Sequence, residues 1–188
     1  METSFSYAMK KIILGLTGEI ASGKGTAVNY LIEKHGASSY RFSSIMRDVL
    51  NRLHLEHSRE LLQRTSSMLR ENFGENIFAR VIAQDIRGDK NPIIVVDGIR
   101  RPEDLEILRE NPDFKLVFIE VGLEKRYERI IKRGENTDDK TKTLEEFKFD
   151  AQREAELTIA GLKERADFIL DNNGTPEELE KQIEKLLK

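Results

Sequence analysis

Apolar residues along the chain fall into two patterns, continuous runs and helical spacing, and the two patterns alternate. Continuous apolar runs occupy residues 11–17, 92–98 and 115–121. A run of this kind is typical of a strand that is buried on both faces of a parallel sheet. Shorter apolar segments at 38–42 and 167–171 predict further strands.

Segments with apolar residues at helical spacing lie between the predicted strands. Ser58 and Thr175 are placed to cap the helices that follow them, and Pro176 suits a first helical turn. The predicted helices cover residues 24–34, 45–53, 58–72, 76–87, 102–110, a segment that ends at Arg133, 144–165 and a final segment from 176. Strands that alternate with helices predict an α/β protein with three layers, α/β/α, around a five-stranded parallel sheet.

The chain shows no internal repeat and no low-complexity linker, so we expect a single domain. This domain spans residues 10–188, and residues 1–9 predict a flexible N-terminal tail. Hydrophobic residues make up 38% of the chain and charged residues 35%. This balance, with clean strand and helix patterns, indicates a globular protein rather than a disordered one.

The charge and the cysteine content exclude several classes of function. The net charge is −3, which gives no general reason to expect nucleic-acid binding, so any basic site must be local. The chain has no cysteine, which excludes disulfides, thiol catalysis and cysteine-ligated metal sites. No segment has the character of a signal peptide or a membrane span. We expect a cytoplasmic protein, a monomer or small homo-oligomer, with no membrane or nucleic-acid partner.

Glycines, a lysine and a threonine are crowded between the first predicted strand and the first predicted helix. Gly18, Gly23 and Lys24 have the spacing Gly-x4-Gly-Lys that is typical of a phosphate-binding loop. The glycines let backbone N–H groups turn toward phosphate oxygens, and the following helix N-terminus adds a favourable dipole. The residues predicted to bind the phosphates of ATP are Gly18, Ala21, Ser22, Gly23, Lys24, Gly25 and Thr26.

Two side chains are candidates for contact with a Mg²⁺ ion, directly or through water. Gly25 stands where the motif usually carries serine or threonine, and the hydroxyl follows one residue later, at Thr26. Asp97 lies at the end of the predicted strand 92–98, where a buried carboxylate is unfavourable unless it meets a metal ion or a polar network. The alternative for Asp97 is a cap on the turn that follows the strand.

Arginines follow at the same predicted edge of the sheet. Arg100 and Arg101 suit a dianionic acceptor phosphate, because a guanidinium group binds phosphate oxygens in pairs; either one is alternatively a solvated surface charge. Arg126, Arg129 and Arg133 share one face of a predicted helix. Such a row is either a solvated charged face or a set of groups that screen a phosphoryl group in transfer.

Several segments together resemble a known family of enzymes. The loop ends in GKGT, as it does in adenylate kinases. FSSIMRDVL at 42–50, VVDGIRRPEDL at 95–105 and RYERIIKRG at 126–134 are similar to segments of the P-loop nucleoside and deoxynucleoside monophosphate kinases. The ending ADFILDNNGTPEELEKQI, at 166–183, is similar to that of dephospho-CoA kinases. The resemblance covers almost the whole chain after Met9.

This resemblance implies a helical insertion that binds the acceptor and a short lid at residues 134–142. Arg47, Arg100 and Arg101 would bind the acceptor, although Arg47 also suits an exposed residue that pairs with nearby carboxylates. Asn173 and Gly174 would lie near the adenine of ATP. The catalytic residues that the resemblance implies are Lys24, Asp97, Arg129 and Arg133.

The implied activity is transfer of the γ-phosphoryl group of ATP, with Mg²⁺, to a nucleoside or deoxynucleoside monophosphate. Dephospho-CoA is the alternative acceptor, phosphorylated on its ribose 3′-hydroxyl with Asp97 accepting the proton. Ser43 and Ser44 stand where dephospho-CoA kinases carry an acidic pair, which favours the monophosphate. A further alternative is an ATP-binding regulatory module without significant transfer, because a fold does not determine a function.

Overall fold

The computed structural model describes residues 11–133, 142–152 and 154–188. The predicted N-terminal tail at 1–9 and nearly all of the predicted lid at 134–142 lie outside the described residues. Within the described segments, no helix combines the length and the apolar character needed to cross a lipid bilayer.

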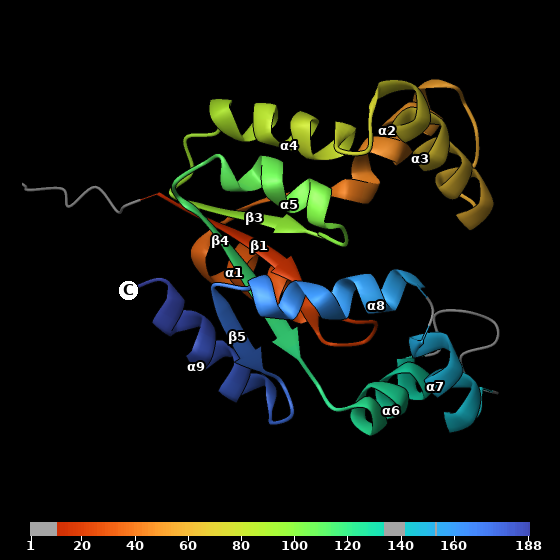
Figure 1. The fold of residues 1–188 in the computed structure, drawn as a ribbon. Helices are drawn as coiled ribbons and strands as arrows, with labels where there is room; N and C mark the ends of the chain where they lie inside the picture. Colours follow the sequence, from red (N-terminus) through yellow and green to blue (C-terminus); the bar gives the residue numbers. More distant parts are fainter. Residues whose placement is uncertain (1–10, 134–141, 153) are drawn as a thin grey trace, which may run out of the picture.

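A single parallel sheet forms the middle layer of the molecule, as the sequence predicted (Figure 1). Its strands lie in the order β2-β3-β1-β4-β5, and every neighbouring pair is parallel. The strands are β1 (Ile12–Thr17), β2 (Ser38–Arg41), β3 (Ile93–Asp97), β4 (Phe114–Glu120) and β5 (Phe168–Asp171). Because all strands run the same way, the segments that follow them meet at one edge of the sheet.

The helices lie on both faces of this sheet and beyond one end of it (Figure 1). The α-helices are α1 (Lys24–His35), α2 (Phe42–Arg52), α3 (Arg59–Phe73), α4 (Ile77–Gly88), α5 (Pro102–Arg109), α6 (Leu123–Arg133), α7 (Leu144–Ala151), α8 (Glu154–Gly161) and α9 (Pro176–Leu186). A 3₁₀ helix, η1, covers Leu162–Arg165. The three-layer α/β/α prediction is therefore confirmed.

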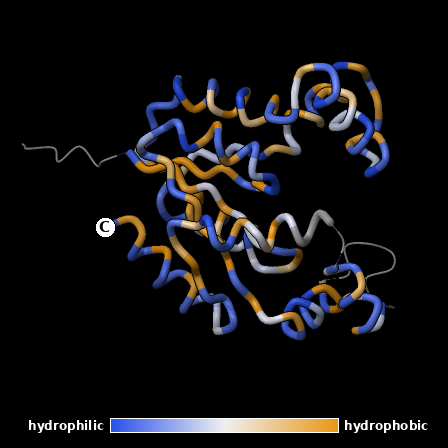
Figure 2. The backbone as a smooth tube through the Cα atoms, viewed as in Figure 1, coloured by the Kyte–Doolittle hydropathy of each residue, from blue (hydrophilic) through white to orange (hydrophobic). Residues whose placement is uncertain are grey.

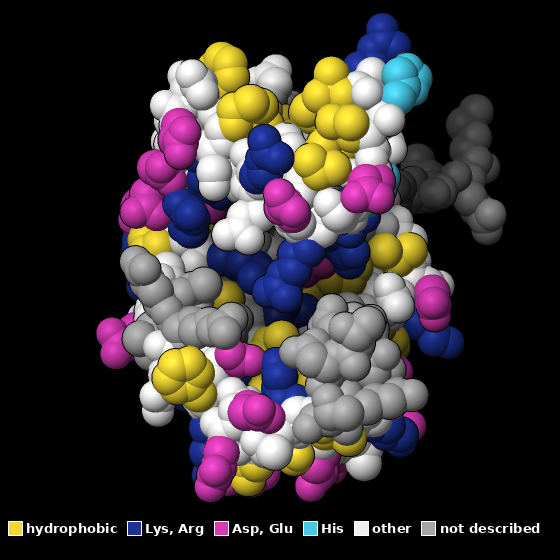
Figure 3. Space-filling view, turned by 90° about the vertical axis from the view of Figure 1, so that its right-hand side faces the viewer, with side chains coloured by type: hydrophobic (Ala, Val, Ile, Leu, Met, Phe, Trp, Pro, Cys, Tyr) yellow, Lys and Arg dark blue, Asp and Glu magenta, His cyan; other side chains and the backbone are white. Residues whose placement is uncertain are grey.

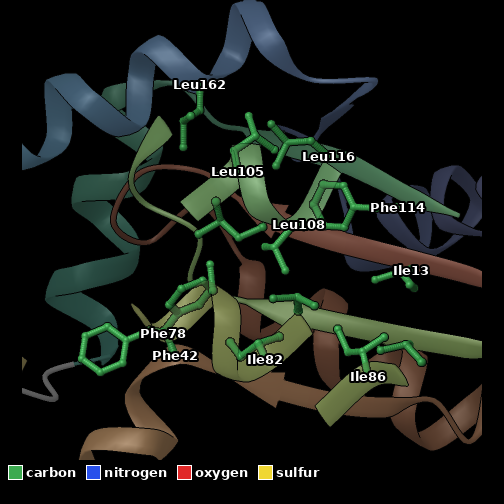
Figure 4. Packing of buried hydrophobic residues seen from close by; sticks show 14 residues of the cluster. Ile13, Phe42, Phe78, Ile82, Ile86, Leu105, Leu108, Phe114, Leu116 and Leu162 are labelled. Atoms are coloured by element: carbon green, nitrogen blue, oxygen red, sulfur yellow. The ribbon is translucent and has the colours of Figure 1, made fainter. Parts of the chain in front are cut away.

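The two faces of the sheet carry separate apolar cores, because alternate residues of a strand point to opposite faces. On β3, Ile94 and Val96 pack with α4 and α5, whereas Ile93 and Val95 pack with α1 and α9. Figure 4 shows the first core, in which Phe78 of α4 and Phe114 of β4 are among the packed side chains. Figure 2 shows hydrophobic residues along the strands in the centre and hydrophilic residues on the outer turns of the helices.

The predicted element boundaries differ from the observed ones by more than one residue in two places. The segment 144–165, predicted as one helix, consists of α7, α8 and η1. Helix α2 begins at Phe42 rather than at residue 45, because the Phe42 side chain turns into the core directly after β2 ends. The predicted caps are confirmed: Ser58 accepts a hydrogen bond from the Leu61 N–H, and Thr175 forms a capping box with Glu178.

A buried ion pair links α3, one of the helices between β2 and β3, to α5. Arg70 of α3 donates to both carboxylate oxygens of Asp104 on α5, at 3.4 and 3.1 Å. The Arg70 guanidinium also lies 4.8 Å from the centre of the Phe78 ring. Burial raises the pKa of Asp104, and the charge of Arg70 opposes this rise. The pair thus holds α3 against α5, and loss of either partner would leave the other charge buried without a counter-charge.

Replacement of Arg70 by methionine should destabilise the protein by about 3 kcal/mol, because it leaves the Asp104 carboxylate buried without its partner. Loss of Arg70 also raises the pKa of Asp104 further. The folded state then holds this proton more tightly than the unfolded chain, so stability should rise more steeply than in wild type as the pH falls from neutral. Urea unfolding across this pH range measures both effects. The double variant R70M/D104L should recover most of the loss, and equal instability of both variants would contradict the pair's role.

Candidate active site

The loop between β1 and α1 lies at the edge of the sheet where the strands end, and its backbone conformation restricts its sequence. Gly18, Ala21 and Gly23 have positive φ angles of 147°, 59° and 96°. A Cβ atom on Gly18 would lie 2.6 Å from the carbonyl oxygen of Ile119, and one on Gly23 would lie 2.2 Å from the Nδ2 atom of Asn172. Glycine is therefore required at both ends of the loop on steric grounds.

Lys24 is the first residue of α1, and its side chain folds back over the loop. Its Nζ atom donates to the carbonyl oxygens of Gly18 at 2.5 Å and Glu19 at 3.0 Å. The Ser22 hydroxyl oxygen lies 3.5 Å from the same nitrogen, and Ser22 itself is buried. The ammonium group and the N-terminus of α1 thus converge on one loop, which is the combination that favours an anion.

The two positions after Lys24 differ in their surroundings. A Cβ atom on Gly25 would meet nothing within 4 Å, so the position usually taken by serine or threonine has room for a side chain. Thr26 is exposed. No group of three or more His, Asp or Glu side chains suited to a metal ion occurs among the described residues. A metal contact at Thr26 stays a prediction.

Asp97 forms an ion pair that the sequence analysis did not predict. It is the last residue of β3, with 8% of its surface exposed, and it accepts a hydrogen bond from the Nε atom of Arg41 at 2.8 Å. Arg41 ends β2 and lies beside Asp97 in the register of the two strands. The sequence contains one signal for this pair: Arg41 and Asp97 each lie near the end of a predicted strand. The spacing of the residues does not reveal that these two strands are neighbours in the sheet.

The predicted acceptor arginines lie on two parts of the structure, helix α2 and the loop between β3 and α5. Arg47 is on α2, exposed, with its Nη1 atom 3.4 Å from the Nδ1 atom of His57. Arg101 is paired with Glu75, which precedes α4. Arg100 is also exposed, and it makes no ion pair within the part of the chain that the structure describes. Neither the Arg100 nor the Arg101 side chain is buried in the fold.

The side chain of Arg129, on α6, contacts backbone carbonyl oxygens of the phosphate loop. Its Nη2 atom donates to the carbonyl oxygen of Asn172 at 2.8 Å, and its Nη1 atom lies 3.4 Å from the carbonyl oxygens of Ala21 and Ser22. Arg133 is the last residue of α6, and its side chain lies outside the described residues. Arg129 is therefore brought to the loop, whereas the placement predicted for Arg133 stays untested.

Asn172 is the residue after β5 that contacts the phosphate loop. It is 5% exposed, and its Nδ2 atom donates to the carbonyl oxygen of Ser22 at 2.8 Å. Asn173, which was predicted to lie near the adenine, accepts a hydrogen bond from the Gly122 N–H through Oδ1 at 2.8 Å. At Gly174 a Cβ atom would lie 1.7 Å from a carboxylate oxygen of Glu178, so the glycine permits a close approach. The adenine contact predicted for Asn173 and Gly174 stays a prediction.

Arg126 is buried, so a solvated charged face does not describe it. Only 3% of its surface is exposed, and its Nη2 atom donates to the Oε1 atom of Glu19 at 2.8 Å. Its guanidinium lies 5.7 Å from the centre of the Phe147 ring of α7. Helix α6 therefore contacts the phosphate loop through two arginines that are three residues apart, Arg126 and Arg129.

The charges of this edge differ from those of the whole chain. Figure 3 shows the face of the molecule where the strands end, and lysine and arginine side chains gather in the middle of it. The chain as a whole has a net charge of −3. A local basic site on an acidic protein favours an anionic ligand at this position.

Comparison with known proteins gives the family. The sequence model described as AAA domain matches residues 17–148. The chain is 30% identical to a UPF0200 protein of Thermococcus gammatolerans, covering 94% of each chain, and 31% identical to one of Sulfurisphaera tokodaii, covering 94% of this chain and 96% of that relative. The chain belongs to the UPF0200 proteins and carries an AAA domain.

Solved structures similar to this UPF0200 protein share its fold. A shikimate kinase from Bacteroides thetaiotaomicron has a TM-score of 0.61 at 18% identity, covering 93% of this chain and 96% of that one. A shikimate kinase from Aquifex aeolicus has a TM-score of 0.56 at 20% identity, covering 94% and 96%. The P-loop kinase fold is thus confirmed for this UPF0200 protein, while assignment to the monophosphate kinases stays a prediction.

Replacement of Ala21 by glycine should raise the free energy of unfolding by about 0.5 kcal/mol. Relief of about 1–2 kcal/mol of left-handed strain exceeds the greater chain entropy of glycine in the unfolded state. The matched variant A21V should be destabilised, because a β-branched residue is still less suited to a positive φ. Thermal unfolding of the three proteins measures this order, and an A21G variant less stable than wild type would contradict it.

Proposed function

We propose that this UPF0200 protein is an ATP-dependent phosphotransferase that transfers the γ-phosphoryl group of ATP to a nucleoside or deoxynucleoside monophosphate. The observation that carries the proposal is the loop at 18–23, in which Gly18 and Gly23 leave no room for a side chain and the Lys24 ammonium lies across the backbone. Backbone N–H groups, a helix N-terminus and a lysine are the groups that bind the β- and γ-phosphates in P-loop enzymes.

The donor set around the loop suits Mg²⁺ as it is used with phosphate substrates. Mg²⁺ binds through one or two protein oxygens and keeps phosphate oxygens and water as its other ligands. Thr26 would supply a hydroxyl and Asp97 a carboxylate, the latter through water. Bound there, the ion would neutralise charge between the phosphates. Arg41 lies on Asp97 in the structure and would keep that carboxylate in a defined orientation.

The residues of α6 support a transfer that depends on positioning and charge. Phosphoryl transfer asks for little covalent work from the protein. Arg129 contacts the carbonyl oxygens of Ala21 and Ser22, so it is placed to hold the loop in one conformation. Arg133 would face the phosphoryl group from the end of the same helix. With Lys24 and Asp97, these arginines make up the proposed catalytic set.

The acceptor side favours a monophosphate over a ribose hydroxyl. A monophosphate presents an anionic oxygen and needs cationic groups more than a base. Arg47, Arg100 and Arg101 would supply these groups, and Arg41, at the end of β2, would add a fourth guanidinium. Asp97, which a hydroxyl acceptor would need as a base, has its Oδ2 atom bound by Arg41.

Replacement of Lys24 by alanine should lower kcat by at least about 100-fold with every acceptor, since a charge aimed at the moving group is lost. ADP release in a coupled assay measures this. Lys34, exposed in the last turn of the same helix, provides the matched control, and K34A should retain full activity. ATP binding by the wild type with no turnover in any acceptor screen would instead favour a regulatory module.

Replacement of Arg47 by alanine should lower kcat/KM for the acceptor about tenfold or more, because a charge-assisted hydrogen bond to its phosphate is lost. The KM for ATP should stay unchanged. Arg52, exposed on the same helix, is the control, and R52A should behave as wild type. The same assay run over ribo- and deoxyribonucleoside monophosphates and dephospho-CoA tests the acceptor, and activity with dephospho-CoA alone would overturn the proposal.

A further inference from the structure

A carboxylate lies within the phosphate loop of this protein, where it opposes the proposed ligand. Glu19 directly follows Gly18, and its carbonyl oxygen is one of those that the Lys24 ammonium contacts. A negative charge beside a polyphosphate lowers the affinity of the loop by simple repulsion. Some other group must therefore offset Glu19 if the loop is to bind a nucleotide.

Arg126 is placed to be that group. Its Nη2 atom lies 2.8 Å from the Oε1 atom of Glu19, and the two side chains are 3% and 23% exposed. An exposed ion pair contributes little, but this pair has one deeply buried partner and is therefore less screened than a surface pair. The contact also holds the Glu19 side chain against Arg126 of α6, whose guanidinium lies over the Phe147 ring of α7.

The geometry of Arg126 is poor for stability alone. Its Nε and Nη1 atoms are buried and have no hydrogen-bond partner among the residues that the structure describes. A buried guanidinium with unpaired donors costs free energy that an apolar side chain of similar size avoids. A need for positive charge next to Glu19 explains an arginine at this position better than packing does.

We propose that Arg126 is a positioning residue that neutralises Glu19 and holds it against α6, and so sets the affinity of the loop for a nucleotide polyphosphate. This inference rests on the proposed function, because it assumes that the loop binds a nucleotide. Arg129, one turn further along α6, contacts the second half of the same loop. Helix α6 thus controls both the charge of the loop, through Arg126, and its conformation, through Arg129.

A double-mutant cycle on the full chain tests the charge role. The variants are R126M, E19Q and E19Q/R126M, and the measurement is the dissociation constant for MgATP by calorimetry. R126M should weaken binding about tenfold, the effect of one uncompensated charge near the ligand. E19Q should bind as tightly as wild type or more tightly, and E19Q/R126M should return to within about twofold of wild type.

Inorganic tripolyphosphate serves as a second probe, since it carries the charges without the base. It should follow the same order of affinities, and the R126M defect should shrink as the salt concentration rises. A merely structural role for Arg126 would lower the thermal stability of R126M without rescue of binding by E19Q. R126K, which keeps the charge, should bind better than R126M and provides the test if R126M does not fold.

The outcomes separate this inference from the proposed function. No binding of MgATP by the wild type would overturn both. Binding by the wild type with an unchanged dissociation constant in R126M, or a defect of equal size in the presence and absence of E19Q, would overturn only the role of Arg126. Rescue by E19Q with both probes supports it.

Discussion

The close packing of the loop at 18–23 against the ends of β4 and β5 is the constraint on which the site depends. Because Gly23 has no Cβ atom, the amide of Asn172 reaches the Ser22 carbonyl oxygen. The Asn172 carbonyl oxygen then accepts from Arg129, which extends the contact to α6. A side chain at Gly23 would have to displace the Asn172 amide, so this glycine permits the contact between the loop and the residue that follows β5.

Three carboxylates around this edge are paired with guanidinium groups. A carboxylate near a phosphate site is repulsive unless a cation offsets it, and each of these pairs places an arginine where an incoming anion would also need one. The overall negative charge of the chain is therefore compatible with a basic site. The pairs are Arg41 with Asp97, Arg101 with Glu75 and Arg126 with Glu19.

The helix that carries the proposed acceptor residue Arg47 is held to the fold by a different interaction. Arg70 and Asp104 form a buried pair between α3 and α5, next to the Phe78 ring. Helix α2 carries Arg47 and packs against α3, so the position of this arginine depends on the buried pair that holds α3. The two sides of the site thus rest on separate supports, backbone packing at the loop and a buried ion pair at the insertion.

The sequence by itself determined the strands, most of the helices and the phosphate loop, because apolar runs, caps and glycine spacing are properties of consecutive residues. It did not determine which side chains meet across the sheet. The contact of Arg41 with Asp97 arises because β3 lies between β2 and β1, and the burial of Arg126 arises because α6 packs on the loop. Asn172 reaches the loop for the same reason: contacts between residues distant in sequence depend on strand order and helix packing, which only the tertiary structure decided.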